Sequence, residues 1–442
     1  MMPRRAAGRA MARMAPRVLV HRADQAGPVG SDPRRALLLH LYRTALRRVD
    51  GRHVVARTLR AQVPVDTAVI ALGKAAAAMM AGAQEVLGAH CVCGFVVTAP
   101  GYERHLTPLA RVAVHVGDHP VPGPASLAAG EALEAFIAAL PADLPVLVLV
   151  SGGASSLVER LLPGVTAADL VQLNQWAHGI DLPIGALNAL RRRFSALKDG
   201  RLAARLAGRP AQAFVLSDVP DDDPAVVGSG LVAVLPSPPL QLPAGLPAAL
   251  VQRLGEITAP LGATLPVTLV GCLREALDAV EVVARGLGCT VERQLARIDG
   301  PAGLAGTFFA RRLLACAAEV LIGGGETTVR LPPSPGVGGR SQHFALSAAL
   351  VLEGDPVCAL LAAGTDGADG ASEDAGAMVD GGTCARATLE GQDPAACLRD
   401  ADSGRCLEAS GDLVYTGPTS TNVGDIVIGL KMQDVRLERL SV

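Results

Sequence analysis

Short runs rich in β-branched residues and leucine recur along this chain, and each run leads into a turn that contains glycine or aspartate. The runs are DTAVIAL, VLVLV, AFVLSDV, PVTLVG, EVLIGGGETTV and CALLAAGTDG. The first turn is followed by an alanine-rich stretch of helical character, AAAAMMAGAQEVLG. Strands that alternate with helices at this spacing predict βαβ crossovers and therefore mostly parallel sheets. In such sheets the functional loops lie at the carboxyl ends of the strands.

The length of the chain predicts two domains, because 442 residues exceed what one hydrophobic core usually organises. Prolines are concentrated between about Val232 and Pro266, where they interrupt regular structure. We place the interdomain connection there, and expect one domain over residues 33–235 and a second over residues 266–442. A surface excursion within one domain is the alternative for the proline-rich stretch.

The first 30 residues are rich in arginine and nearly free of acidic residues. Mitochondrial transit peptides share this composition, but no apolar region of signal-peptide length follows the charges. We therefore interpret residues 1–32 as a disordered extension or as the product of an upstream start codon. The next segment, Pro33–Val49, is expected to form an amphipathic helix with Leu37, Leu38 and Leu41 on one face.

The composition argues against several classes of protein. A formal net charge of −2 without a long basic stripe disfavours a nucleic-acid partner. No stretch of about 18 uncharged apolar residues occurs, so no transmembrane helix is expected. Nine cysteines, with Cys91 and Cys93 in a predicted strand, fit neither a disulfide framework nor a zinc site. The expected compartment is a reducing one, the cytoplasm.

Lys74 is the first candidate for phosphate binding. It follows Gly73 directly after a predicted strand and stands at the start of a predicted helix. Its ammonium group and the free amides of the first helical turn can face the same anion. No Walker A pattern surrounds it, so a solvated lysine at a βα turn is the alternative for this dipeptide alone.

Two glycine-rich loops have the composition of phosphate cradles. The loop SGGASS combines glycines and hydroxyls, and its candidate residues are Ser151, Gly152, Gly153 and Ser155. Such a loop lets backbone amides approach phosphate or carboxylate oxygens closely. In the second loop Gly324 and Gly325 precede Glu326, whose carboxylate can reach a metal or a ribose hydroxyl. Glycines that only tighten a turn are the alternative in both loops.

Acidic residues follow two other predicted strands. TDGADG places Asp366 and Asp369 on a glycine-softened loop after CALLAAG. Mg²⁺ is usually held by one or two carboxylates together with substrate phosphates, and Asp366 is our candidate for that role. An EF-hand is excluded by the missing glutamate at the twelfth position, and a plain Asp-Gly turn is the alternative. Asp218, in LSDV, is a further acid at a strand end.

Basic residues elsewhere could bind an acidic substrate. Arg340 follows the flexible segment PSPGVGG, and a guanidinium group matches a carboxylate or a phosphate bidentately. Asn188, Arg191 and Lys198 lie on a probable helix and could anchor such a substrate, although a solvated basic face is the default for residues of this kind. The histidines, His119 among them, form no recognisable ligand pair, and we interpret them as structural or surface residues.

Together these segments resemble the glycerate kinases that form 2-phosphoglycerate, whose carboxy-terminal half is the MOFRL domain. The stretches that carry the resemblance are LGKAA, GDHPVPGPAS, VSGGASSL, LNALRRRFSALKDGRLA, LSDV, IGGGETTV, GGRSQ, AAGTDGADG and TGPTSTNVGD. They occur in the family order from Leu72 to Asp425, and the joint match is far more specific than any single motif.

The resemblance implies an α/β fold, with a Rossmann-like amino-terminal domain built on a parallel sheet and a smaller mixed α/β MOFRL domain. It also implies an interdomain cleft that binds ATP, Mg²⁺ and D-glycerate. In that cleft Lys74 would stabilise the phosphoryl group in transfer, and Arg340 would hold phosphate or the glycerate carboxylate. Asp366 would help hold Mg²⁺, and Asp218 could receive the proton of the 2-hydroxyl. The expected partner is a small-molecule substrate rather than a nucleic acid or a membrane, and a monomer or homodimer is expected.

The sequence departs from the family pattern mainly at positions expected to face the substrate. Arg193 stands where the family usually has histidine, and the family's K-G-G has become Lys198-Asp199-Gly200. Leu231 lies in the segment where the family carries A-S-G-P-T, and Leu273 replaces an expected asparagine. The phosphate-binding segments are retained. The sequence therefore identifies the kinase chemistry more firmly than it identifies the acceptor.

Two other functions are weighed against the kinase. Relatives of this family are often labelled hydroxypyruvate reductases, but a dinucleotide-binding reductase needs a G-x-G-x-x-G fingerprint, which SGGASS and IGGGETT do not provide. A non-catalytic small-molecule sensor derived from the kinase is the third interpretation. The retention of Lys74, Arg340 and Asp366 counts against the sensor.

Overall fold

The computed structural model describes residues 32–105, 111–180, 182, 184–235 and 242–433. The predicted extension, apart from Asp32, lies outside the described residues. From Pro33 onward the chain forms one compact unit. None of the helices in the described part of the chain combines the length and the hydropathy that crossing a membrane requires.

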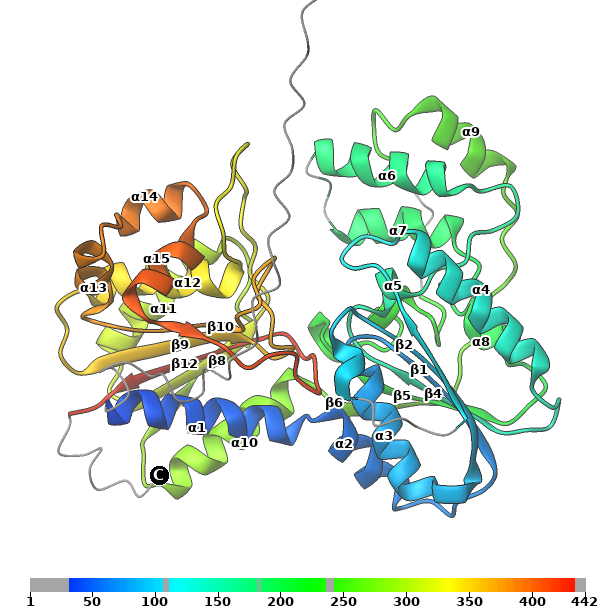
Figure 1. The fold of residues 1–442 in the computed structure, drawn as a ribbon, viewed down its shortest axis with the longest axis horizontal. Coiled ribbons are helices and arrows are strands. Elements are labelled where there is room, and N and C mark those ends of the chain that lie inside the picture. The colour runs from blue at the N-terminus through cyan, green and yellow to red at the C-terminus, as the bar shows by residue number, and fades with distance from the viewer. Residues whose placement is uncertain (1–31, 106–110, 181, 183, 236–241, 434–442) are drawn as a thin grey trace, which may run out of the picture. The chain divides into compact units, whose positions relative to one another are not determined.

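The first sheet is parallel throughout, in the order β3-β2-β1-β4-β5-β6 (Figure 1). Its strands are β1 Thr67–Leu72, β2 Cys91–Thr98, β3 Val112–Val116, β4 Val146–Val150, β5 Ala211–Leu216 and β6 Val267–Gly271. The chain builds outward from β1 through β2 to β3 and then returns to place β4 on the other side of β1. This is the strand order of a Rossmann fold, with its switch point between β1 and β4. The Rossmann-like prediction is confirmed.

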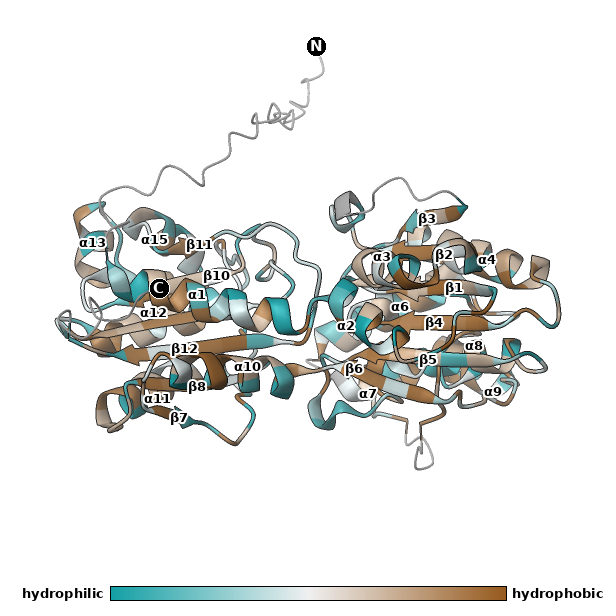
Figure 2. Ribbon diagram, turned by 90° about the horizontal axis from the view of Figure 1, so that it is seen from below, coloured by the Kyte–Doolittle hydropathy of each residue, from teal (hydrophilic) through white to brown (hydrophobic). Residues whose placement is uncertain are grey.

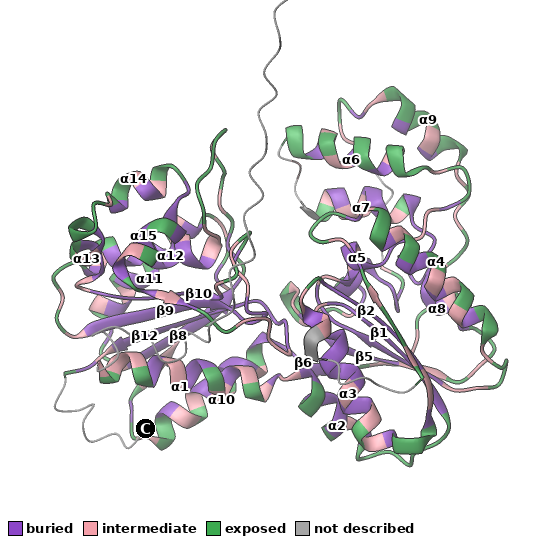
Figure 3. Cartoon of the chain, viewed as in Figure 1, coloured by how far each residue is buried: buried purple, intermediate pink, exposed green. Residues whose placement is uncertain are grey.

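Continuous apolar runs explain the core of this sheet. Every residue of β1 and of β4 is buried, as Figure 3 shows, which is expected of strands covered on both faces. Helix α3, Ala76–Leu87, packs against β1 and β2 through small alanines and two methionines. The other helices near this sheet are α2 Gly51–Leu59, α4 Pro124–Ala139, α5 Ala154–Leu157 and α8 Arg201–Arg205. In β2, Cys91 is buried and Cys93 half-buried, in agreement with their predicted place in a strand.

Three further helices of this part share a core of their own. They are α6 Ala167–Gly179, α7 Ile184–Phe194 and α9 Ala248–Glu256. Leu173, Leu190 and Leu250 are fully buried in this core. The 3-10 helices are η3 Gly88–His90, η4 Tyr102–His105, η5 Pro220–Asp222 and η6 Val227–Ser229.

The second sheet is mixed, in the order β11-β10-β9-β12-β8-β7. Its strands are β7 Val291–Arg293, β8 Val320–Gly325, β9 Cys358–Gly364, β10 Gly376–Asp380, β11 Leu413–Val414 and β12 Asp425–Lys431. The strands β7 and β8 are parallel, and the other neighbouring pairs are antiparallel. The expectation of mostly parallel sheets is therefore wrong for this half, because β12 enters from the far end of the chain between β8 and β9. The mixed α/β prediction for this domain is confirmed.

The position of β12 decides where the loops of the second sheet meet. Since β8 and β9 both run antiparallel to β12, they run in the same direction as each other. Their carboxyl ends therefore lie at the edge where β12 begins. The register agrees, because Asp425 at the start of β12 pairs with Gly325 on one side and Gly364 on the other.

Helices cover both faces of the second sheet. Side chains alternate along β12, so that Ile426 and Ile428 join the core formed with α1, Pro33–Arg48, and α10, Leu273–Gly286. The intervening Val427 joins the core formed with α11, Ala302–Ala315, and α12, Arg340–Leu352. The other helices of this half are α13 Thr383–Leu389, α14 Pro394–Arg399 and α15 Ser403–Ser410. The hydropathy colouring in Figure 2 marks β8 and much of β12 as apolar, as burial on both faces requires.

Helix α1 confirms the predicted amphipathic helix, since Leu37, Leu38 and Leu41 are buried. The helix packs against α10, β12 and β9, all from the carboxy-terminal half of the chain. An ion pair of 2.7 Å between Arg35 Nη1 and Asp412 Oδ1 adds to this contact, 377 positions apart in sequence. The first helix of the described chain is thus built into the second sheet's core.

Candidate active site

The loops after β1, β4 and β5 meet because these three strands are neighbours in a parallel sheet. The amide of Lys74 donates to Gly152 O at 2.9 Å, and the amide of Ala75 donates to Ser151 Oγ at 3.0 Å. The Lys74 turn and the SGGASS loop, predicted separately, therefore form one structure. Gly153, at φ +83°, begins α5 in a left-handed conformation that glycine adopts without strain.

Asp218, which follows β5, lies against the same loop. A Cβ placed on Gly152 would stand 1.9 Å from Asp218 Oδ2 and 2.2 Å from Asn422 Nδ2, so only glycine fits there. Asn422 Nδ2 donates to Asp218 Oδ2 at 3.1 Å, and Arg297 Nη2 donates to the backbone oxygen of Asp218 at 3.0 Å. Burial, together with the neighbouring Glu326 carboxylate, raises the pKa of Asp218 to about 6.

Lys74 is joined to the second sheet by an ion pair. Its Nζ lies 2.6 Å from Asp366 Oδ2, and both side chains are largely buried. Asp366 follows β9 as predicted. The ion pair brings a residue from the carboxyl end of β1 to a residue from the carboxyl end of β9.

Arg340 begins α12 and is held between two carboxylates. Its Nε and Nη2 donate to the two oxygens of Asp425 at 2.6 and 3.0 Å, and its Nη1 donates to Glu326 Oε1 at 2.7 Å. Although burial opposes the charge, Asp425 and Glu326 raise the pKa of Arg340 above its usual range. The Asp369 carboxylate caps the start of α12, because it accepts hydrogen bonds from the amides of Ser341 and Gln342 at 3.0 and 2.8 Å.

Three buried hydroxyls next to these residues have no hydrogen-bond partner among the described residues. They belong to Ser217, Ser341 and Thr421, the immediate neighbours of Asp218, Arg340 and Asn422. Buried hydroxyls are normally satisfied, so each orphaned group is a place where a bound polar molecule or water would complete a hydrogen bond.

The glycines of the second predicted cradle have packing reasons of their own. A Cβ on Gly325 would lie 1.9 Å from Ile298 O, and one on Gly324 would lie 2.9 Å from Leu273 Cδ1. Close approach of neighbouring chain segments therefore accounts for both glycines. Ser155 Oγ is within 2.8 Å of Ser229 Oγ, so this hydroxyl of the first loop is paired with the last residue of η6.

The predicted substrate-binding residues fall in two places. Arg191, on α7, donates from Nε and Nη2 to Asn174 Oδ1 and lies 3.4 Å from Asn188 Oδ1, so the structure brings Asn188 and Arg191 together. Lys198 lies beyond the end of α7 and has no exposed side-chain surface. Its ammonium is bonded to Glu159, whose other oxygen accepts from the Ser195 hydroxyl at 2.6 Å.

Sequence reasoning assigned no functional role to three residues near this site. Asp425 and Asn422 both lie in TGPTSTNVGD, a stretch that the resemblance marks without assigning a role. His119 is exposed, as expected of a surface residue, and it lies beside this loop, because a Cβ on Gly153 would lie 3.5 Å from His119 Cδ2 and 3.2 Å from Lys74 Cγ. The surrounding protein and the Lys74 charge lower the pKa of His119 to about 4, so this ring is neutral at physiological pH.

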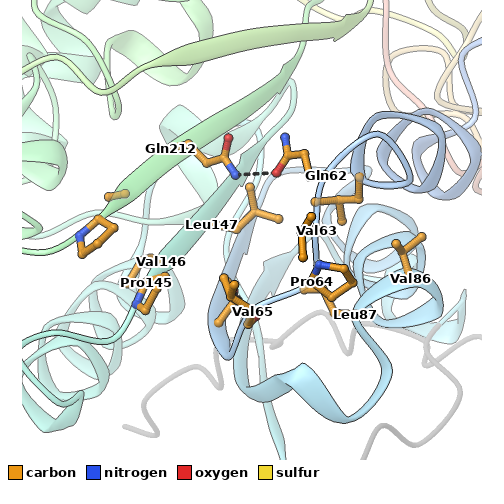
Figure 4. Close-up of a pocket in the computed structure, with 14 residues that line it drawn as sticks. Gln62, Val63, Pro64, Val65, Val86, Leu87, Pro145, Val146, Leu147 and Gln212 are labelled. Atoms are coloured by element: carbon orange, nitrogen blue, oxygen red, sulfur yellow. Dashed lines mark hydrogen bonds between the residues drawn. The ribbon is translucent and has the colours of Figure 1, made fainter.

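A pocket of about 260 Å³ lies at the opposite edge of the first sheet (Figure 4). It is lined by residues at the amino ends of β1, β4 and β5, among them Thr67, Val146 and Ala211. A hydrogen bond of 3.0 Å joins Gln212 to Gln62 across it. All of its lining residues are uncharged, so it lacks the groups that phosphoryl transfer needs.

Comparison with known proteins identifies the family. Residues 319–425 match the model of the MOFRL family, and residues 37–241 match a family described as a domain of unknown function, DUF4147. The D-glycerate 2-kinase of Thermotoga maritima is 34% identical over 382 residues, which cover 82% of this chain and 89% of that protein. The chain belongs to the glycerate 2-kinase family.

Other members of the family agree with this. The glycerate 2-kinase of Pyrococcus horikoshii is 30% identical over 90% of this chain and 94% of its own length. A crystal structure of the Thermotoga maritima glycerate kinase matches with a TM-score of 0.76 and 31% identity, over 90% of this chain and 99% of that one. A protein of Agrobacterium vitis, provisionally named a hydroxypyruvate reductase, is 33% identical to this chain. The match covers 89% of this chain and 93% of that protein. The fold and the family predicted from the sequence are confirmed.

Proposed function

We propose that this chain is an ATP-dependent phosphotransferase that moves the γ-phosphoryl group of ATP to the 2-hydroxyl of D-glycerate and forms 2-phosphoglycerate. The observation that carries the proposal is the 2.6 Å contact between Lys74 Nζ and Asp366 Oδ2. It joins the strand-end loops of the two sheets, where phosphate-binding groups of α/β proteins collect. The membership of the glycerate 2-kinase family supports the same reaction.

Two fixed cations supply most of the chemistry. Phosphoryl transfer depends mainly on positioning and on neutralising charge over the phosphoryl oxygens. Lys74 presents an ammonium beside the SGGASS loop, and Arg340 presents a guanidinium whose orientation is set by Asp425. In the proposed reaction, Lys74 stabilises the phosphoryl group in transfer and Arg340 holds phosphate or the glycerate carboxylate.

Asp218 is the proposed base for the 2-hydroxyl. A pKa of about 6 leaves it deprotonated at neutral pH but still able to accept a proton as the hydroxyl attacks. The Asn422 amide fixes one carboxylate oxygen at 3.1 Å.

Mg²⁺ is part of the proposal, and the residues present fit it. A Cβ placed on Gly364 would lie 3.1 Å from Asp366 Oδ1 and 3.5 Å from Asp425 Oδ1, so two carboxylates face the same strand end. Mg²⁺ prefers such oxygen ligands and takes the rest from phosphates and water. Within the described residues no cluster of three or more ligating side chains is present. When bound, the ion would neutralise phosphate charge.

The remaining assignments are also proposals. Backbone amides of the loop with Gly152 and Gly153 would bind ATP phosphates together with Ser151 and Ser155, and Glu326 with its two glycines would line the nucleotide site from the second sheet. Asn188 and Arg191 would contact the acceptor. Lys198 could do so only if its buried pair with Glu159 opened. A cytoplasmic monomer or homodimer remains our expectation.

One experiment tests the function against its alternatives. Purified protein would be incubated with Mg·ATP and D-glycerate, and ADP release and the phosphorylated carbon would be determined. The proposal expects 2-phosphoglycerate. NADH oxidation with hydroxypyruvate in place of ADP release would support the reductase, and ligand binding without either turnover would support the sensor.

The acceptor should be screened in the same assay. Leu231 is fully buried in the core, and Leu273 packs against Gly324. Neither therefore offers the polar contact expected at that place in the family, and weaker discrimination between D-glycerate and related hydroxy acids follows. Strict use of D-glycerate would contradict this part of the proposal.

A further inference from the structure

Three successive backbone carbonyl groups at the end of β9 each accept a hydrogen bond from a side-chain hydroxyl. We call this segment, Gly364–Asp366, the Asp366 turn. The hydroxyl of Tyr42 donates to its first carbonyl at 2.6 Å, that of Thr419 to the second at 2.5 Å, and that of Tyr102 to the third at 2.9 Å. The donors come from α1, from the loop before β12 and from η4. The backbone that carries the proposed metal-binding carboxylate is thus fixed by side chains that are distant in sequence.

Both tyrosines are buried and remain hydrogen-bond donors. Tyr42 has no exposed surface and Tyr102 has 6%. Burial raises the pKa of each phenol, and the Asp366 carboxylate raises it as well, so neither hydroxyl ionises near neutral pH. Because water does not readily reach these positions, removing either hydroxyl weakens the hold on a buried carbonyl group.

Tyr102 and Lys74 both bind Asp366, and both follow strands of the first sheet. Lys74 follows β1 and Tyr102 follows β2, and these strands are paired neighbours in the first sheet. Lys74 binds the carboxylate of Asp366 at 2.6 Å, while Tyr102 binds its backbone oxygen. The amide of Thr419 donates to the same oxygen at 3.0 Å from the second sheet's side. Asp366 is therefore held by its main chain and its side chain at once.

We propose that Tyr42 and Tyr102 are positioning residues that set the Asp366 carboxylate relative to Lys74 during phosphoryl transfer. The inference rests on the proposed kinase function. Both hydroxyls are directed to backbone oxygens, so their effect on the reaction passes through Asp366. If the Asp366 turn moved by a fraction of an ångström, the Asp366 carboxylate would be misplaced. Its contribution to phosphoryl transfer depends on its position.

The chain contains three tyrosines, and this permits a matched test with one kind of substitution. Tyr42→Phe and Tyr102→Phe each remove a buried hydroxyl without creating a cavity, and Tyr415→Phe removes one from a residue that is 60% exposed. Turnover would be measured as ADP release against D-glycerate, ATP and Mg²⁺. Each buried variant should lower kcat about tenfold and raise the Mg²⁺ concentration for half-maximal rate severalfold, with KM for glycerate changed less than about twofold.

Two further measurements separate positioning from general weakening. In an Asp366→Asn background, Tyr102→Phe should cost less than about twofold, because residues that act through one group are not additive. Hydrogen exchange of a peptide covering residues 364–371 should be faster in Tyr42→Phe and Tyr102→Phe than in wild type and Tyr415→Phe, while peptides of β1 and β4 keep their rates.

The inference is overturned if Tyr102→Phe matches Tyr415→Phe in turnover and exchange, or if its cost is unchanged by Asp366→Asn. A wild-type protein without ATP-dependent turnover of glycerate would refute the proposed function itself. The exchange comparison needs no turnover, so it would still decide whether the hydroxyls fix the Asp366 turn.

Discussion

The contact between Gly152 and Asp218 gives a sharp test of the proposed base. In Gly152→Ala, the added Cβ would start 1.9 Å from Asp218 Oδ2 and 2.2 Å from Asn422 Nδ2. Ordinary contact begins at about 3.4 Å, so the carboxylate has to retreat by about 1.5 Å and give up its 3.1 Å bond to Asn422. A misplacement of about 1 Å can cost on the order of 10²-fold in rate, which is about 2.7 kcal/mol of transition-state stabilisation.

The assay is coupled ADP release with saturating Mg·ATP and D-glycerate. Turnover of Gly152→Ala should fall about 10²-fold, while KM for ATP changes less than about threefold if the clash acts through Asp218 rather than through the phosphate cradle. Gly286→Ala is the control, because a Cβ there meets no atom within 4 Å. Turnover of Gly152→Ala within about threefold of wild type would refute the assignment of Asp218.

Three further predictions follow from the same geometry. Lys74→Ala and Arg340→Lys should each lower kcat on the order of 10²-fold or more with the fold intact. Arg340→Lys is impaired because the point charge of lysine cannot replace the two-pronged guanidinium group that Asp425 orients. Near-normal ADP release in either variant would show that the replaced residue does not act in phosphoryl transfer. Since Asp218 must be deprotonated to act as base and its pKa is raised to about 6, kcat/KM should fall as the pH drops through about 6, and a profile flat down to pH 5 would contradict the role. Lys198→Met should lower the free energy of unfolding by about 3–5 kcal/mol, because it strands a buried Glu159, and the double variant with Glu159→Gln should recover most of the loss in urea denaturation.

The sequence could predict the part of the site that lies on the first sheet. Lys74, Ser151 and Asp218 each follow an apolar run, and the runs prove to be β1, β4 and β5, which are adjacent. Parallel strands place their carboxyl ends at one edge, so the sequence could assign each residue to that edge, while the adjacency of the three strands comes from the fold. The spacing of apolar residues likewise identified α1 and its buried face.

Less of the part of the site that lies on the second sheet could be predicted from the sequence. Asp425 lies at the amino end of β12, and the rule for carboxyl ends does not point to it. Only the antiparallel placement of β12 between β8 and β9 brings Asp425 to Arg340. A local pattern does not say which strands will be neighbours, so this part of the site requires the tertiary fold.

Lys198 illustrates the same limit for a single side chain. Its neighbours in sequence are those of a polar helix end, and a lysine there is usually solvated. The structure pairs it with Glu159, 39 positions earlier, where neither side chain has more than 1% exposure. Burial of a charge depends on a partner that only folding supplies.

The packing of α1 against the second half of the chain has a consequence for synthesis of the protein. Tyr42 and its acceptor Gly364 are 322 positions apart, and Arg35 and Asp412 are 377 apart. At about 5–20 residues per second a ribosome needs some tens of seconds to deliver the partners of α1 after the helix has emerged. During that interval the leucine face of α1 is exposed, and the nascent chain requires protection from aggregation at its amino end. These contacts join distant parts of the described chain, so a truncated translation product would lack the partners of α1 and would be open to proteolysis.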